Sequence, residues 1–287
     1  MKLAFTVLSL LVATALLPAQ STFQEPEDFG CFHIPFEFEE DTVDILIRPN
    51  QEDYDKKKPL LLFVQGSMPK PLLRYDESGR FGTFPFDANI FVKDYHLAII
   101  SKPSIPLICH EDELEQPHSM YKDPQTGEFP KKYCQNNHLD YYVNRNKAVL
   151  DFLSKKEWID ENKIVVVGHS EGVSIAFKMA LEKAKMTHLV LLNGNLATRM
   201  MSIIINNREV EQNKEDYLKT EKLFHYWQSL VATNPLDLSD DCSKSDSNKA
   251  TASFSFPYRQ YISDIDIPVF VGYGTKDKSV GSSCTKG

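Results

Sequence analysis

The chain has 287 residues, of which 42% are hydrophobic and 25% are charged, and this is ample for a single domain with one large core. Its net charge of −8 and the lack of any dense Lys/Arg stripe make nucleic acid a poor candidate partner, since Lys56, Lys57 and Lys58 form an isolated run before a strand.

The first residues have the pattern of a secretory signal peptide. Lys2 is followed by an apolar stretch that ends at Leu17, and Ala19-Gln20 offers a cleavage point. The stretch is short for a membrane span, and no cysteine stands at the cleavage point to carry a lipid. We therefore expect a signal peptide over residues 1–19, a mature domain over 20–287 and export to the periplasm or the cell exterior without a membrane anchor.

Seven apolar runs predict the strands of one sheet. They lie at the spacing of βα units, and several are continuous rather than alternating, which is typical of parallel strands buried on both faces. In chain order the runs are Phe32–Phe38, Thr42–Arg48, Lys58–Ser67, Tyr95–Pro103, Asn162–Ser170, Thr187–Asn195 and Ile267–Asp277.

Two helices are predicted between these strands. From Leu139 to Leu153 the apolar side chains follow helical spacing, so one face should pack on the sheet. From Val173 to Leu181 apolar side chains surround the helix on nearly all sides, which indicates a central, buried position. The alternation predicts an α/β fold with a mostly parallel, doubly wound sheet covered on both faces.

Two long segments interrupt this alternation. Residues 104–138 are rich in Pro, His, Asp and Glu without periodicity, which predicts a long loop. Residues 196–265 hold an apolar run at Met200–Ile205 and then an amphipathic helix around Phe224 and Trp227, which predicts a helical cap insertion. Long insertions after strand ends usually shape the mouth of a site.

The expected export predicts disulfides among the five cysteines, because disulfides persist in oxidising compartments. Cys109 and Cys134 bracket one loop-like segment, and we expect them to form a disulfide. A pair between Cys242 and Cys284 is a weaker expectation, which leaves Cys31 over. An alternative gathers a metal site from five residues, although their spacing fits no standard zinc pattern: Cys109, His110, His118, Cys134 and His138.

The segment Gly168-His169-Ser170-Glu171-Gly172 matches the pattern G-x-S-x-G between a predicted strand and a predicted helix. In this context the pattern is typical of a nucleophile elbow, a turn so tight that its flanking positions carry almost no side chain. Ser170 would then lie at a helix N-terminus, where N–H groups and the helix dipole favour negative charge. An ordinary glycine-flanked turn is the alternative, but the complete strand, elbow and helix favour Ser170 as a nucleophile.

With this motif the chain resembles the α/β-hydrolases, the broad group that contains bacterial esterases and serine peptidases. The resemblance implies an oxyanion hole from the backbone N–H of Glu171 and a second N–H in the segment Gln-Gly-Ser-Met-Pro. Ser67 is the expected second donor and Met68 the runner-up. Gln65 stands where many members of the group have histidine.

The resemblance also implies the acid of a catalytic triad after the last predicted strand, where Asp277 matches. A helix-capping role for this aspartate is the alternative. The base should follow the acid, yet the ten residues after Asp277 contain no histidine. His169 adjoins Ser170, but the elbow geometry should point its side chain away from the hydroxyl. We therefore expect a sequence truncated before its last helix, strand and histidine loop; a degenerate, non-catalytic member is the alternative.

Together these features predict a serine hydrolase that cleaves an ester through an acyl-enzyme on Ser170. A serine peptidase of the same fold and a non-catalytic binding protein with that fold remain the alternatives. The expected partner is a small-molecule or peptide substrate, and the pattern implies no cofactor and no metal.

Overall fold

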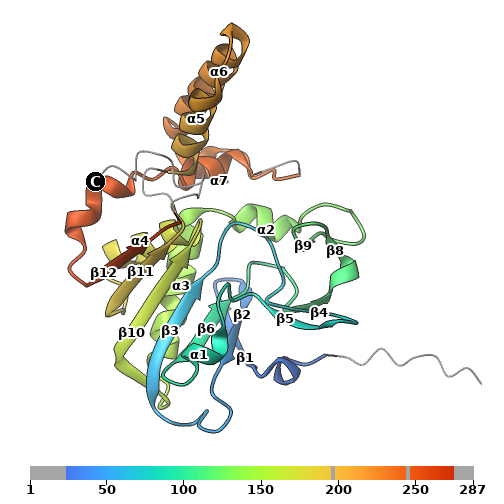
Figure 1. The fold of residues 1–287 in the computed structure, drawn as a ribbon, viewed down its shortest axis with the longest axis vertical. Helices are drawn as coiled ribbons and strands as arrows, with labels where there is room; N and C mark the ends of the chain where they lie inside the picture. Colours follow the sequence, from blue (N-terminus) through green and yellow to red (C-terminus); the bar gives the residue numbers. More distant parts are fainter. Residues whose placement is uncertain (1–23, 195–197, 244–245, 275–287) are drawn as a thin grey trace, which may run out of the picture.

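The computed structural model describes residues 24–194, 198–243 and 246–274, and its main feature is a seven-stranded sheet (Figure 1). In spatial order the strands are β1 (Phe32–Phe38), β2 (Asp41–Arg48), β6 (His96–Ile100), β3 (Lys58–Val64), β10 (Ile159–His169), β11 (His188–Leu192) and β12 (Val269–Gly272). The first two strands pair antiparallel, as do β2 and β6, and the remaining neighbours are parallel. The predicted mostly parallel α/β sheet is therefore confirmed.

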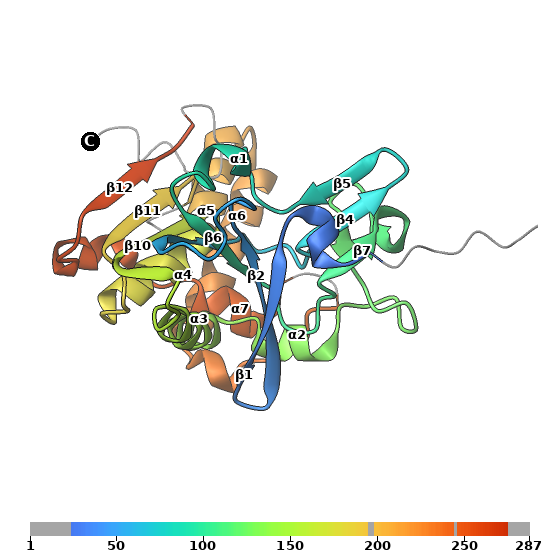
Figure 2. The same cartoon turned by 90° about the horizontal axis from the view of Figure 1, so that it is seen from below.

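The two faces of the sheet are covered differently, as Figure 2 shows. Helices α3 (Leu139–Leu153) and α4 (Gly172–Leu181) cover one face, where they pack on alternate side chains of the central strands. In the described part of the chain, the other face is covered by the short helix α1 (Ala88–Phe91), by irregular chain that contributes Phe84 and Phe86, and by Leu73 and Ile108 of the small sheet described below. Because successive strand residues point to opposite faces, one continuous apolar run such as β3 supplies both cores.

Helix α4 is buried nearly all round, as its apolar sequence predicts. Val173, Ile175, Ala176, Phe177 and Met179 are each no more than 2% exposed. This helix follows directly on the strand at the centre of the parallel part of the sheet, so the turn between them is held from several sides.

The segment 104–138, predicted as a loop, contains regular structure. Strand β4 (Leu73–Asp76) pairs with β5 (Gly79–Gly82) on one side and with β7 (Ile108–His110) on the other. A two-stranded ribbon of β8 (Leu114–Glu115) and β9 (Met120–Tyr121) follows, and then helix α2 (Lys131–Asn136). These strands were missed because they are short and because β7 pairs with a segment distant in the sequence.

Between β11 and β12 the chain is mainly helical. It forms α5 (Arg199–Val210), α6 (Lys214–Val231) and α7 (Asn248–Ser253), with the 3-10 turns η3 (Pro235–Asp237) and η4 (Tyr258–Asp264). The remaining 3-10 turns are η1 (Pro26–Phe29) and η2 (Glu111–Glu113). Figure 1 shows α5 and α6 projecting away from the sheet as a pair, with α7 nearer its edge. None of the helices in the described ranges is long and apolar enough to cross a membrane.

Candidate active site

Ser170 occupies a tight turn between β10 and α4. Its φ of 56° lies in the left-handed region that residues with a side chain rarely adopt, and its N–H donates to the Leu192 carbonyl over 3.0 Å. A Cβ on Gly168 would lie 2.4 Å from the Gly172 carbonyl oxygen, and a Cβ on Gly172 would lie 2.1 Å from the Val64 carbonyl oxygen. Backbone packing therefore requires glycine on both sides of this exposed serine.

The loop after β3 lies directly beside Ser170. A Cβ on Gly66 would approach the Ser170 Cβ to 3.2 Å and its Oγ to 3.5 Å. The Gln65 amide nitrogen donates to the Ile100 carbonyl over 2.8 Å, so it fastens this loop to β6. Within the described ranges the Ser67 N–H donates to no backbone carbonyl, as a donor kept for a ligand requires.

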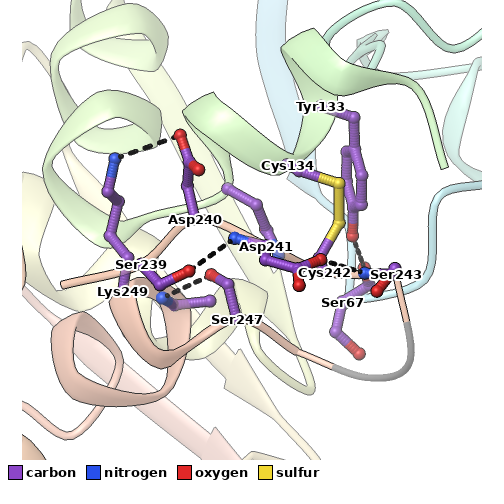
Figure 3. The surroundings of a disulfide bond; sticks show 12 residues. Ser67, Tyr133, Cys134, Ser239, Asp240, Asp241, Cys242, Ser243, Ser247 and Lys249 are labelled. Carbon is purple, nitrogen blue, oxygen red and sulfur yellow. Dashed lines mark hydrogen bonds and ion pairs between the residues drawn. A yellow bond between two sulfur atoms is a disulfide. The ribbon is translucent and has the colours of Figure 1, made fainter.

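Helix α2 supports the same loop from the other side (Figure 3). The Tyr133 hydroxyl donates to the Ser67 backbone carbonyl over 3.1 Å, and the Tyr133 ring is buried. The next residue, Cys134, forms a disulfide with Cys242, which lies between η3 and α7. The loop beside the serine, helix α2 and the segment before α7 are therefore joined through two adjacent residues.

The expected disulfide between Cys109 and Cys134 is wrong. Cys109 is a buried free thiol in β7, and its pKa is raised to about 12 mainly by burial. The sequence interval suggested a closed loop, but β7 is held in the small sheet while α2 packs against the distant residue Cys242. The second expected pair cannot be assessed because Cys284 lies outside the described residues.

A pocket of about 230 Å³ opens at Ser170. Its lining comes from β3, the loop after it, the segment before α1 and the elbow: Phe63, Gln65, Gly66, Ser67, Met68, Lys70, Thr83, Pro85, His169 and Ser170. The serine hydroxyl and the loop backbone therefore face one cavity, in which a bound ligand would touch both.

A buried pair of opposite charges lies behind the elbow. The Lys102 ammonium is 4.0 Å from the Glu171 carboxylate, and the two side chains are 2% and 8% exposed. Burial lowers the pKa of Lys102 to about 8, although the carboxylate opposes this shift. The Lys102 ammonium also lies 4.8 Å from the centre of the Tyr142 ring. The side chain of Glu171 is thus held inside the protein, while the backbone of Glu171 remains in the turn.

The structure separates the residues of the alternative metal site. Cys134 is in the disulfide, and the His138 Nδ1 accepts the Tyr141 N–H at the start of α3 over 3.3 Å. His110 instead lies with Glu77 and Asp112, a group in which both carboxylates are exposed. The expected set is therefore not a single site.

The predicted acid, Asp277, lies outside the described residues. His169 is the histidine that lines the serine pocket in the described part of the chain, and its ring centre lies 6.3 Å from that of Phe63. Further histidines are engaged away from the pocket: His188 with Thr187, and His225 with Gln228. The structure therefore brings together Ser170, Glu171 and Ser67.

Three residues of the site were missed in the sequence: Lys70, Lys102 and Tyr133. Lys102 lies two residues after the end of a buried strand, and the carboxyl ends of parallel strands are where sites form, so its position was a usable signal. Lys70 follows three residues after Ser67 in the loop already singled out. Tyr133 carries no such signal, because its contact is made by a helix from another part of the chain.

Comparisons with known proteins show the family and the fold of the chain. The family model described as BAAT / Acyl-CoA thioester hydrolase C terminal matches residues 138–284, just over half of the chain, whereas no curated protein matches. A 2,6-dihydroxy-pseudo-oxynicotine hydrolase is similar in structure, with a TM-score of 0.50 and 15% identity over 88% of this chain. Since the match covers 55% of that hydrolase, the chain spans about half its length.

Two further solved structures are similar over most of the chain. A hypothetical protein from Pseudomonas aeruginosa has a TM-score of 0.50 and 13% identity, with 90% of this chain and 83% of that chain covered. A putative lipase from Acinetobacter baumannii AYE has a TM-score of 0.46 and 13% identity, with 90% and 79% covered. The two structures with a TM-score of 0.50 show a common fold, and their low identities leave the substrate open.

Proposed function

Because this chain belongs to the BAAT / acyl-CoA thioester hydrolase C-terminal family and has the α/β-hydrolase fold, we propose that it is a serine hydrolase acting on an acyl ester or thioester. The single observation that carries the proposal is Ser170 at φ 56° in a glycine-flanked turn, exposed to a pocket. A serine held in this strained conformation has a role beyond linking a strand to a helix.

In the proposed reaction a base takes the proton of the Ser170 hydroxyl as Oγ attacks the acyl carbon, and that proton passes to the alcohol or thiol that leaves as the acyl-enzyme forms. The backbone N–H groups of Glu171 and Ser67 stabilise the negative oxygen of the tetrahedral intermediate, and water then releases the acid. Each such donor is worth about 3 kcal/mol in the transition state. The position of Asp277 after β12 supports its role as the acid that orients a base.

A serine-reactive fluorophosphonate tests this proposal on the native protein isolated from its source. Labelling should occur, and Ser170→Ala should abolish it while the free energy of unfolding stays within about 0.5 kcal/mol, as is usual for an exposed side chain. Ser174→Ala, one turn along α4, is the matched control and should keep the label. Labelling that survives Ser170→Ala would move the chemistry elsewhere, and a native protein that takes up no label would favour a non-catalytic binding protein.

We also propose that the protein is exported and that residues 1–19 are removed. The disulfide between Cys134 and Cys242 supports this, because such bonds persist mainly in oxidising compartments. N-terminal sequencing of the native protein should find a first residue close to Gln20. A native protein that retains Met1 would contradict the proposal.

A further inference from the structure

The pocket at Ser170 contains one cationic side chain in a chain of negative net charge. The whole sequence carries −8, yet among the described residues the lining contains Lys70 and no carboxylate. A lysine in such a lining attracts an anion and disfavours a cation.

Lys70 is not neutralised by its neighbours in the described part of the chain. The nearby Glu111 carboxylate is bound by Arg74 over 2.6 Å, and Ser119 and Gln116 donate to it over 2.9 and 3.1 Å. Arg74 and Glu111 therefore satisfy each other, and Lys70 forms no ion pair among the described residues. Lys70 is at the same time one of the residues that line the pocket.

The surroundings of Lys70 favour the binding of an anion more strongly than those of a lysine on the open surface. The side chain is half-buried, and burial, together with the adjacent Arg74, lowers the pKa of its ammonium. Both causes disfavour the charged form of the ammonium, and the attraction of an anionic ligand offsets them. Phe63, Met68 and Pro85 supply an apolar wall beside it.

We propose that this pocket binds the part of the substrate that ends in a carboxylate or a phosphate, with Lys70 as its counter-ion. The inference rests on the proposed function, which it narrows to esters or thioesters with a short apolar body and an anionic end. Ser170 and Lys70 line the same cavity of about 230 Å³, so a ligand that fills it lies beside both residues. Lys70 thereby selects the substrate without taking part in bond breaking.

Binding to Ser170→Ala, which cannot turn over, tests the inference by ligand-observed NMR titration. The probes are monomethyl glutarate, butyl phosphate and the neutral dimethyl glutarate. At least one anion should bind about tenfold more tightly than the diester, and the preference should weaken with added salt. Tighter binding of the phosphate or of the carboxylate identifies which group the site prefers.

Added to Ser170→Ala, Lys70→Met should abolish the preference and Lys70→Arg should keep it. Lys163→Met removes an exposed lysine at the far end of β10 and is the control for net charge. Equal binding of the three probes, or a preference that survives Lys70→Met, would overturn the inference. Fluorophosphonate labelling reports separately on the proposed function, since a labelled serine without anion preference refutes only the role of Lys70. Anion preference in a protein that takes up no label refutes only the hydrolase.

Discussion

The Tyr133 hydroxyl reaches 66 residues back along the chain to the Ser67 carbonyl, with 3.1 Å between the two oxygens. Tyr133 is 3% exposed, and its neighbour Cys134 is bonded to Cys242. The loop beside Ser170 is therefore positioned by a helix outside the central sheet. This relationship makes Tyr133 a positioning residue for the proposed oxyanion hole.

Removal of the Tyr133 hydroxyl should lower the reactivity of Ser170 more than it lowers the stability of the protein. In Tyr133→Phe the Ser67 backbone loses its anchor, so fluorophosphonate labelling at saturating probe should slow about tenfold. The free energy of unfolding should fall by only about 1 kcal/mol, the usual net value of one hydrogen bond. Rapid labelling and urea denaturation measure the two effects.

Tyr141→Phe is the matched control for this variant. The Tyr141 ring is also buried, but its hydroxyl donates to Asp41 over 3.4 Å and not to the loop at Ser67. It should lose similar stability and keep its labelling rate. Equal slowing in both variants would contradict a positioning role for Tyr133.

Features fixed by residues close together in the sequence could be predicted from it, whereas features that depend on distant segments could not. The elbow was predictable because the glycines, strand and helix that fix Ser170 are consecutive in the chain. The alternation of strands and helices was predictable for the same reason, because the apolar periodicity within each segment indicates whether it is a strand or a helix. Short strands such as β7 and the disulfide partner of Cys134 depend on segments far away, and no local pattern encodes them.

The disulfide can be checked chemically. Non-reduced peptide mapping of the native protein should recover Cys134 linked to Cys242, with Cys31 and Cys109 as free thiols. Because the bridge spans 108 residues, its reduction should lower the free energy of unfolding by about 5 kcal/mol in the chain-entropy model. Urea denaturation with and without dithiothreitol measures this loss, and Cys134→Ala should be insensitive to the reductant. A peptide that links Cys109 to Cys134 would contradict the structure.

Gly172 should be intolerant of even one added methyl group. A Cβ there would lie 2.1 Å from the Val64 carbonyl oxygen, which is backbone of a central strand and cannot move aside. Gly172→Ala should therefore lower the free energy of unfolding by about 3 kcal/mol or more, as measured by urea denaturation. Gly82→Ala is the control, because a Cβ on Gly82 meets no atom within 4 Å. Similar losses in both variants would mean that the turn is looser than described.

Because of Lys102, the free energy of unfolding should increase as the pH rises into the alkaline range. Burial lowers its pKa in the folded protein to about 8, whereas an unfolded lysine titrates near its ordinary value of 10.5. Between these two values the unfolded chain holds the proton and the folded protein has lost it, so the free energy of unfolding increases with pH. The cost of the buried charge is complete below pH 8 and is relieved progressively above it.

The comparison of the unchanged protein with Lys102→Met measures the effect of this lysine on the pH dependence of stability. The charged groups that act on Lys102 are the carboxylates of Glu171 and Asp246, which favour its protonation, and the guanidinium of Arg145, which opposes it. All three remain in the variant. From pH 7.5 to 9.5 the unchanged protein should gain stability relative to Lys102→Met, with a slope of up to about 1.4 kcal/mol per pH unit. Urea denaturation at intervals of half a pH unit measures the difference. A flat difference across this range, or one that falls, would mean that Lys102 keeps an ordinary pKa in the folded protein and that the pair behind the elbow is open to water.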